Sequence, residues 1–364
     1  MELIIKKNIN WDNIYIVILD KNRKQIENFK LKFSKFGYTK LIFNLSTHKY
    51  IYFTNNKIKT ETVILSEGLY GLEIRYNELT NRYDPLLFNN ETNHSIVKTY
   101  NLKDEKNLPI SKDNKKIINV LLPSDYNKNK EYGLLIMIDS QNLYNNNIHN
   151  YTKLNDPYGG WQVDTTIEVL SKKYNKDIIV VGIETTGNER MLELTQNKDF
   201  GKVRFSHRKI FNNIIENGHL DDTSNFIFET VLPFIKSKYN INDYIGIAGS
   251  SAGGNASYYI ALKHSNIIKY SLPFSPAHTL FSNEAILNFH AKTGYSNVPL
   301  YICCGQVGKL EKSLYKTNKK FINLMNKIYY KNLYVYYEKT ADHNEILWRY
   351  AFADAMSRVF KEIK

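Results

Sequence analysis

From about residue 114 onward, the chain alternates short apolar runs with longer helical segments, and this alternation restricts the folds it can adopt. Runs such as 134–138 and 178–183 are apolar throughout, as in strands buried on both faces of a sheet. Further strands are expected at 116–122, 245–248, 270–274, 300–304 and 333–337, and helices at 163–173, 226–238, 252–263, 314–328 and 345–360. This alternation predicts an α/β fold with a mostly parallel sheet.

The first ~95 residues have a different pattern, in which short β-branched and aromatic segments are separated by polar turns. Strands are expected at 14–19, 40–45, 49–53, 61–65 and 70–75. Closely spaced short strands predict a small antiparallel sandwich. We therefore predict an all-β accessory domain at residues 1–95, a linker or entry strand at 96–113, and an α/β domain at 114–364.

Residues 249–253 read Gly-Ser-Ser-Ala-Gly, a G-x-S-x-G motif between an expected strand and an expected helix. In this position the motif forms a tight, strained turn that exposes its serine at the carboxyl end of the sheet. The N–H groups at the start of the helix add a positive partial charge. Ser251 is therefore the predicted nucleophile. The alternative is an ordinary turn in which Ser250 or Ser251 caps the helix.

A nucleophilic serine needs a base. In hydrolases that carry this motif, the acid and the histidine follow the serine in the chain. His264 follows the helix expected at 252–263 and lies about three turns from Ser251. His290 falls in a helical stretch, and His278 lies in a loop that could line the site. His343 lies between the last strand and the last helix, where the loop leaves the carboxyl edge of the sheet. We predict that His343 is the general base; the alternative is a loop histidine that caps the final helix.

A carboxylate should orient the imidazole, and it should follow the strand before that of His343. Glu311 is the only carboxylate in the loop after 300–304. Asp342 adjoins His343, but neighbours in an extended loop usually point apart, and Glu345 could instead cap the final helix. We predict Glu311 as the orienting acid; the alternative is an exposed loop glutamate.

The oxyanion of acyl transfer needs preorganised N–H donors. The residue after the nucleophile, Ala252, should supply one of them, and the loop after strand 134–138 should supply the other. Within that loop, at residues 139–143, the N–H of Gln141 is the candidate, with Ser140 as the alternative.

Composition excludes several other classes of protein. The chain has 49 Lys and Arg against 36 Asp and Glu, a net charge of +13, but no basic run of roughly 5–8 residues, so no nucleic-acid partner is expected. No apolar run approaches the ~18 residues of a membrane span, and the N-terminus lacks a secretory signal. The adjacent Cys303 and Cys304 fit packing in a reducing compartment, so a cytoplasmic location is expected. No metal or cofactor is expected.

Six segments together resemble the esterase family of α/β-hydrolases that includes enterochelin esterases, feruloyl-type esterases and mycolyltransferases. They are 137–143, 160–164, 180–183 with Glu189-Arg190, 249–254, 308–311, and 343–345 with Trp348-Arg349. The resemblance covers residues 114–364 and implies an α/β-hydrolase fold. The sequence departs from the family pattern at Ser140, where the family has glycine. The serine side chain narrows the loop that holds the oxyanion, but the backbone N–H of this residue is kept.

The resemblance also implies roles outside the triad. It implies substrate-binding roles for Asp139, Asn142, Trp161 and Arg190. In this family the region that corresponds to 187–224 tends to cover the substrate, so this stretch is expected to set specificity. The N-terminal part is similar to starch-binding-type modules, although Trp11 is more simply interpreted as a core residue.

These features predict a serine carboxylic-ester hydrolase with the triad Ser251, His343 and Glu311. Its expected substrate is a small-molecule or glycan ester, such as a siderophore lactone or a sugar acyl ester. An acyltransferase would use the same residues and differ in how water is excluded. The alternative from another class is a carbohydrate- or ligand-binding protein that has lost activity on a hydrolase scaffold. An RNA-binding role would need a basic stripe with stacking aromatics. The sequence does not determine the oligomeric state.

Overall fold

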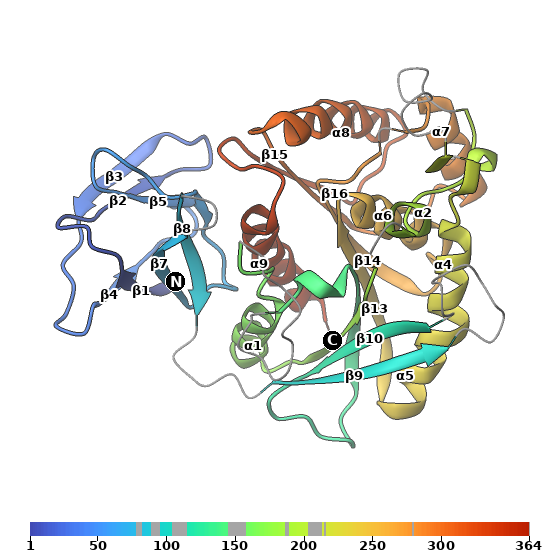
Figure 1. Ribbon diagram of the computed structural model, residues 1–364, viewed down its shortest axis with the longest axis horizontal. Coiled ribbons are helices and arrows are strands. Elements are labelled where there is room, and N and C mark those ends of the chain that lie inside the picture. The colour runs from blue at the N-terminus through green and yellow to red at the C-terminus, as the bar shows by residue number, and fades with distance from the viewer. Residues whose placement is uncertain are drawn as a thin grey trace. The chain divides into compact units, whose positions relative to one another are not determined.

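The computed structural model describes residues 1–77, 82–88, 95–103, 115–144, 158–185, 189–202, 213, 214, 216–278 and 280–363. The chain divides into two compact units. The first comprises Met1–Ser95, Asn142–Lys176 and Lys339–Lys364, and the second comprises Ile96–Gln141 and Asp177–Glu338. Each unit has its own sheets and its own helices (Figure 1).

The second unit is built on an eight-stranded sheet in the order β16-β15-β14-β13-β11-β12-β10-β9. Its strands are β9 (Ile96–Lys103), β10 (Lys115–Leu122), β11 (Tyr132–Ile138), β12 (Ile178–Ile183), β13 (Ile241–Ser250), β14 (Ile268–Phe274), β15 (Leu300–Gly305) and β16 (Leu333–Glu338). Neighbours from β16 to β12 run parallel, and β10 runs antiparallel to both β12 and β9. Every residue of β11, β12 and β15 is buried, which explains their continuous apolar runs.

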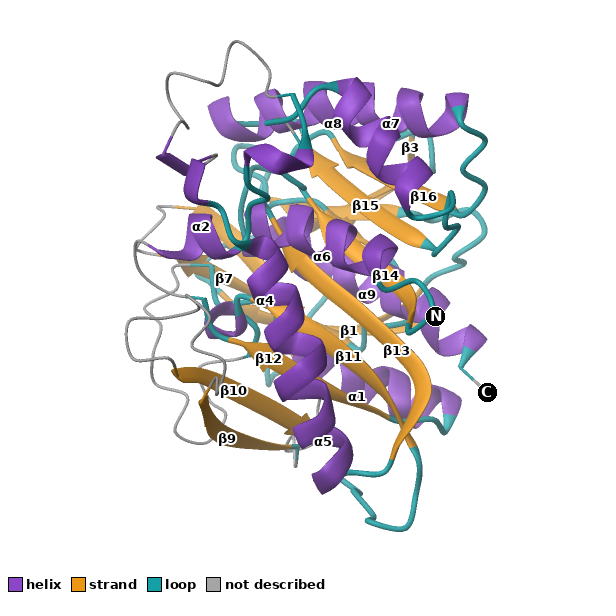
Figure 2. Cartoon of the chain, turned by 90° about the vertical axis from the view of Figure 1, so that its right-hand side faces the viewer, coloured by secondary structure: helices purple, strands orange, loops and turns teal. Residues whose placement is uncertain are grey.

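Helices accompany this sheet. They are α2 (Arg190–Glu193), α4 (Leu220–Phe226), α5 (Leu232–Lys238), α6 (Ala252–Lys263), α7 (Asn283–Lys292) and α8 (Lys309–Lys327), with the short turns η1 (Ser140–Asn142) and η3 (Lys198–Phe200). In Figure 2, α4, α5 and α6 lie along the face of the sheet that is turned toward the viewer. A core of buried side chains, among them Ile136, Ile247 and Ile260, joins strands and helices. The predicted helix at 226–238 is interrupted by a π turn, η4 (Ile227–Val231), just before Pro233.

The first unit contains two four-stranded sheets, β4-β1-β7-β8 and β3-β2-β5-β6. Their strands are β1 (Glu2–Asn8), β2 (Tyr15–Leu19), β3 (Gln25–Lys30), β4 (Tyr38–Ile42), β5 (Tyr50–Thr54), β6 (Val63–Ile64), β7 (Gly71–Asn77) and β8 (Arg82–Phe88). Only the β1–β7 pair is parallel among these described strands. The all-β character predicted for the N-terminal region is therefore confirmed, whereas the predicted domain boundaries stay a prediction.

Two helices of the first unit, α1 (Val163–Tyr174) and α9 (Glu345–Glu362), pack together around aromatic side chains. Arg349 on α9 is fully buried. Its guanidinium donates to the carbonyl oxygens of Gly160 at 2.7 Å and Pro85 at 3.4 Å, and also to that of Tyr158. One side chain therefore joins α9 to strand β8 and to the segment before α1.

We expect Arg349→Met to lower the free energy of unfolding by about 2 kcal/mol or more, because the carbonyls of Gly160 and Tyr158 lose this donor and each such loss costs about 1–3 kcal/mol, whereas the Pro85 carbonyl keeps the Tyr350 hydroxyl. Urea denaturation would measure this change. Arg358→Met, on the same helix but 48% exposed, is the control and should change stability by about 0.5 kcal/mol or less. Equal losses in both variants would contradict the role given to Arg349.

Candidate active site

The carboxyl ends of the parallel strands bring the predicted residues of the second unit to one edge. Asp139 follows β11, Thr185 lies two residues after β12, Ser251 follows β13, Ser275 follows β14, and β15 ends at Gly305. Open α/β sheets bind their ligands at this edge, because the loops that leave parallel strands meet there. These residues of the second unit therefore lie at the carboxyl edge of its sheet.

Ser251 occupies a strained turn between β13 and α6. Its backbone has φ 57° and ψ −119°, a conformation that an L-residue adopts only when its surroundings impose it. The turn is so tight that a Cβ on Gly249 would lie 2.5 Å from the carbonyl oxygen of Gly253. In the part of the chain that is described, the Ser251 side chain makes no capping bond to α6. The strained turn predicted for the motif is therefore present and Ser251 does not cap the helix with its side chain, while its role as nucleophile stays a prediction.

The two predicted oxyanion donors lie at the start of helical turns. Ala252 is the first residue of α6, so its N–H has no acceptor within the helix. Gln141 lies in η1, and its side chain is bound to the end of β12: Nε2 donates to the Thr185 carbonyl at 2.9 Å, and the Thr185 N–H donates to Oε1 at 3.3 Å. These bonds fix the loop that carries the Gln141 N–H, whose catalytic role stays a prediction.

Asp139 and Arg190 bind each other. The guanidinium of Arg190 donates from Nε to Oδ1 at 2.7 Å and from Nη2 to Oδ2 at 2.6 Å, a bidentate ion pair, and the Thr185 hydroxyl also donates to Oδ1. Asp139 is buried and has a positive φ of 64°. The pair therefore holds the loop after β11 in shape, and a direct contact of either residue with substrate stays a prediction.

A second ion pair holds the short helix α2 that carries Arg190. Lys116 on β10 contacts both carboxylate oxygens of Glu193 at 2.5 and 2.6 Å, and both residues are buried. Burial raises the pKa of Glu193, while the Lys116 ammonium opposes that rise. Glu193 is thus bonded to the sheet through Lys116 on β10, and Arg190 is bonded to Asp139 in the loop after β11.

Glu311 lies in the first turn of α8, not in a loop as the sequence suggested. Gly308, with φ 70°, begins the helix earlier than the apolar pattern indicates. The Glu311 side chain is fully buried, and its Oε1 accepts hydrogen bonds from the Gly305 N–H at 2.6 Å and the Ser275 hydroxyl at 2.7 Å. The alternative of an exposed glutamate is therefore wrong, and the carboxylate is held in one orientation.

The turn after β14 links Ser251 to Glu311. The Ser251 N–H donates to the carbonyl of Phe274 at 2.9 Å, and the Ala277 N–H donates to the carbonyl of Ser251 at 3.0 Å. Ser275, between them, donates to Glu311. The structure therefore connects the predicted nucleophile and the predicted acid through a single turn.

Ser275, Gly305 and Thr185 were not among the residues predicted from sequence. Each contributes to the site by orienting a neighbour rather than by its own chemistry. Only their position in the chain could have identified them, because all three lie at or just after the carboxyl end of a parallel strand.

His343 belongs to the first unit, with Trp348 against its ring edge at a centroid distance of 5.0 Å. Asp342 accepts a hydrogen bond from the His343 backbone N–H at 2.7 Å, so its carboxylate is directed to the chain of its own loop. Asn344 caps α9, since its Oδ1 accepts from the Ile346 N–H at 3.1 Å. The side chain that caps α9 is therefore that of Asn344 rather than that of His343.

Asn142 and Trp161, both predicted to bind substrate, also lie in the first unit. Asn142 donates to the carboxylate of Glu345 at 3.1 Å. Trp161 is 2% exposed and packs against Trp348 and Phe352 at centroid distances of 5.7 and 6.2 Å. This packing leaves little of the Trp161 surface for a ligand, and both substrate-binding roles stay predictions.

The other three histidines after Ser251 have structural partners. His264 stacks on Phe228 and bonds to the Ser224 hydroxyl, and His290 bonds to the hydroxyl of Tyr258. Burial lowers the pKa of both His264 and His290 to about 4. A separate buried ring, that of His278, stacks on Phe321.

Cys303 and Cys304 are free thiols buried in β15. Burial raises the pKa of both thiols, which keeps them protonated and weakly nucleophilic. Their position fits the packing role predicted from sequence.

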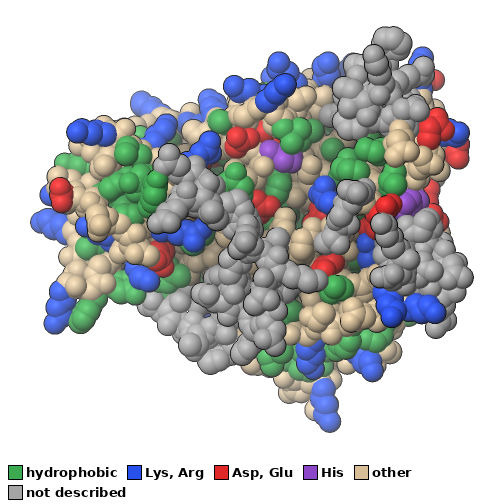
Figure 3. Space-filling model, viewed as in Figure 1, with side chains coloured by type: hydrophobic (Ala, Val, Ile, Leu, Met, Phe, Trp, Pro, Cys, Tyr) green, Lys and Arg blue, Asp and Glu red, His purple; other side chains and the backbone are tan. Residues whose placement is uncertain are grey.

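On the face drawn in Figure 3, Lys and Arg side chains lie mostly along the margin, some of them side by side. Within the described ranges, no group of three or more His, Cys, Asp or Glu side chains is arranged to hold a metal ion. No helix of the described chain has the length and hydropathy needed to cross a membrane. The expectation that nucleic acid is not a partner stays a prediction.

The strand order, the elbow and the buried acid define an α/β-hydrolase. The model of the family described as "Putative esterase" matches residues 112–359, about two thirds of the chain, so the protein belongs to that family and is an esterase. No curated protein sequence matches the chain.

Solved structures of similar fold include three hydrolases. An IroE-like serine hydrolase from Shewanella oneidensis has 16% identity and a TM-score of 0.55, over 73% of this chain and 80% of its own. A feruloyl esterase module from Clostridium thermocellum, complexed with sinapinate, has 15% identity and a TM-score of 0.53 over 76% and 92%. A ferulic acid esterase from Anaeromyces mucronatus has 16% identity and a TM-score of 0.52 over 82% and 98%. At these identities the likeness extends to the fold alone.

Proposed function

We propose that this esterase is a serine hydrolase that works through an acyl-enzyme, with Ser251 as nucleophile, His343 as general base and Glu311 as the orienting acid. The main support is the strained Ser251 turn and its link, through Ser275, to a fully buried Glu311. His343 follows β16 by five residues in the chain, the order in which the histidine follows the acid in this fold.

In the first half of the reaction, the Ser251 hydroxyl attacks the acyl carbon while His343 takes its proton. The N–H groups of Ala252 and Gln141 stabilise the oxyanion that forms. His343 then gives the proton to the leaving alcohol, and the acyl group stays on Ser251. Water releases it by the same sequence, with His343 as base again.

Glu311 contributes by holding the imidazole in one tautomer and by stabilising its protonated form. The Glu311 Oε1 is already bonded to Gly305 and Ser275, so the carboxylate cannot turn freely. A fixed carboxylate requires little reorganisation when the charge on the imidazole changes, and this is the preorganisation that catalysis needs.

We propose a small-molecule or glycan ester as the substrate, with a sugar acyl ester and a siderophore lactone as the two leading classes. Hydrolysis of p-nitrophenyl acetate, p-nitrophenyl butyrate, a feruloylated arabinose and a serine trilactone by the wild-type chain tests this proposal. Turnover of at least one ester is expected. A folded protein that hydrolyses none of the four would contradict the proposed activity and favour a ligand-binding role.

A further inference from the structure

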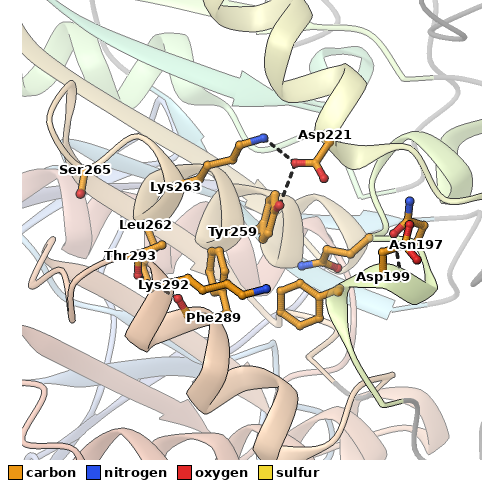
Figure 4. Close-up of a pocket in the computed structure, with 12 residues that line it drawn as sticks. Asn197, Asp199, Asp221, Tyr259, Leu262, Lys263, Ser265, Phe289, Lys292 and Thr293 are labelled. Atoms are coloured by element: carbon orange, nitrogen blue, oxygen red, sulfur yellow. Dashed lines mark hydrogen bonds and ion pairs between the residues drawn. The ribbon is translucent and has the colours of Figure 1, made fainter.

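A pocket of about 530 Å³ opens in the second unit between η3, the outer side of α6 and the end of α7 (Figure 4). Its volume is typical of small-molecule sites, which occupy roughly 300–1,000 Å³. None of the residues assigned above to the candidate active site lines it. Tyr259, at its centre, lies eight residues after Ser251 on α6, which corresponds to about 12 Å of helix rise. A ligand bound here would be remote from the reacting bond.

The charged side chains that line this pocket balance one another. Lys263 bonds to Asp221 at 2.5 Å, and the Tyr259 hydroxyl donates to the same oxygen at 2.7 Å. Asp199 and Lys292, the other two, are exposed, and they extend from opposite sides of the pocket (Figure 4). Asp199 also interacts electrostatically with Lys198, its neighbour in the chain. With two cations and two anions, the pocket favours neither an anionic nor a cationic ligand.

The neutral lining combines amides and hydroxyls with aromatic surface. Gln196 is buried, and its Oε1 accepts a hydrogen bond from Asn255 at 2.9 Å, which fixes the amide in the wall of the pocket. The ring of Phe200 lies 5.8 Å from that of Tyr259 and 5.4 Å from that of Phe289. Asn197, Ser265 and Thr293 add further polar groups. The pocket thus offers hydrogen-bond donors, hydrogen-bond acceptors and apolar ring surface together.

We propose that this pocket binds a neutral oligosaccharide. Each sugar hydroxyl both donates and accepts hydrogen bonds, which suits a lining of mixed carboxylates, ammonium groups, amides and hydroxyls. The C–H groups of a sugar ring can pack against the apolar surface of these aromatic rings. A phosphate or carboxylate ligand would meet Asp199 and Asp221 as well as the two lysines, so the lining gives it no net electrostatic attraction. The site does not depend on the ester chemistry proposed above.

Isothermal titration of the wild-type chain with maltotriose, cellotriose and xylotriose tests this site. At least one of the three is expected to bind with a Kd of about 0.1–10 mM. The double variant Asp199→Ala/Lys292→Ala should weaken that binding about tenfold or more, because both residues line the pocket and offer hydrogen-bonding groups to a sugar. Glu131→Ala/Lys320→Ala removes one exposed charge of each sign away from the pocket and should leave the Kd unchanged.

Three results would overturn the proposal. The first is no binding of any of the three sugars at about 20 mM. The second is binding that the pocket variant leaves intact, which would place the sugar elsewhere on the chain. The third is binding of phosphate or glycine in place of the sugars. Hydrolysis of p-nitrophenyl acetate by both double variants is measured in parallel, so that a failure of the esterase proposal is recognised separately.

Discussion

Ser251→Ala is expected to lower kcat for p-nitrophenyl ester hydrolysis by about 10⁵-fold or more. Without the hydroxyl no acyl-enzyme forms, and only substrate binding and the oxyanion donors can still favour the reaction. The alanine side chain fits the same turn, because Cβ is already present in serine. Steady-state kinetics with p-nitrophenyl butyrate, together with a thermal melt, would separate lost chemistry from lost folding.

Ser250→Ala is the matched control, because Ser250 is the preceding residue in the same motif and is buried at the end of β13. We expect its kcat to stay within about tenfold of the wild-type value. If Ser250→Ala were the inactive variant instead, the nucleophile would be misassigned. If both variants kept full activity, the hydrolysis would not use this turn at all.

Glu311→Gln is expected to lower kcat by about 10³–10⁴-fold, with a much smaller change in KM. Glutamine keeps the shape of the side chain and one oxygen for the hydrogen bonds from Gly305 and Ser275, so the fold should persist. It loses the negative charge that stabilises the imidazolium. The same ester assay and a thermal melt would show a folded but nearly inactive protein.

Asp342→Asn is the control for this assignment, since Asp342 is the acid next to His343 in the chain. Its carboxylate accepts from the His343 backbone N–H, and an asparagine oxygen can accept the same bond. We expect kcat to change by about threefold or less. A large loss in Asp342→Asn with little effect in Glu311→Gln would transfer the role of the acid to Asp342.

The elements of the sheet were predictable where burial covers both faces of a strand. In β11 and β12 every residue is buried, and the apolar runs mark them without ambiguity. β3 gave no such signal, because all of its residues are exposed and its sequence, QIENFK, has no alternation. β8 contains Pro85, which the pattern of a strand disfavours. These strands form through pairing with neighbours rather than through their own composition.

The chemistry of the site was predictable to the extent that it follows chain order. Ser251 lies in a motif, and Glu311 is the carboxylate that follows β15 in the chain. That Glu311 is helical, buried and bonded to Ser275 depends on Gly308 starting α8 early, which a hydrophobic pattern does not record. The Asp139–Arg190 pair likewise joins residues far apart in the sequence. Such contacts are tertiary, so sequence periodicity alone cannot show them.

The most direct test of the central claim is covalent labelling with a fluorophosphonate, read by intact mass and peptide mapping. The account predicts one adduct per wild-type chain, located on Ser251, and no adduct in Ser251→Ala under the same conditions. Labelling should also abolish ester hydrolysis in proportion to the fraction of chains modified. A folded wild-type chain that takes no label and hydrolyses no ester, or one labelled at a residue other than Ser251, would contradict the assignment of Ser251 as the nucleophile.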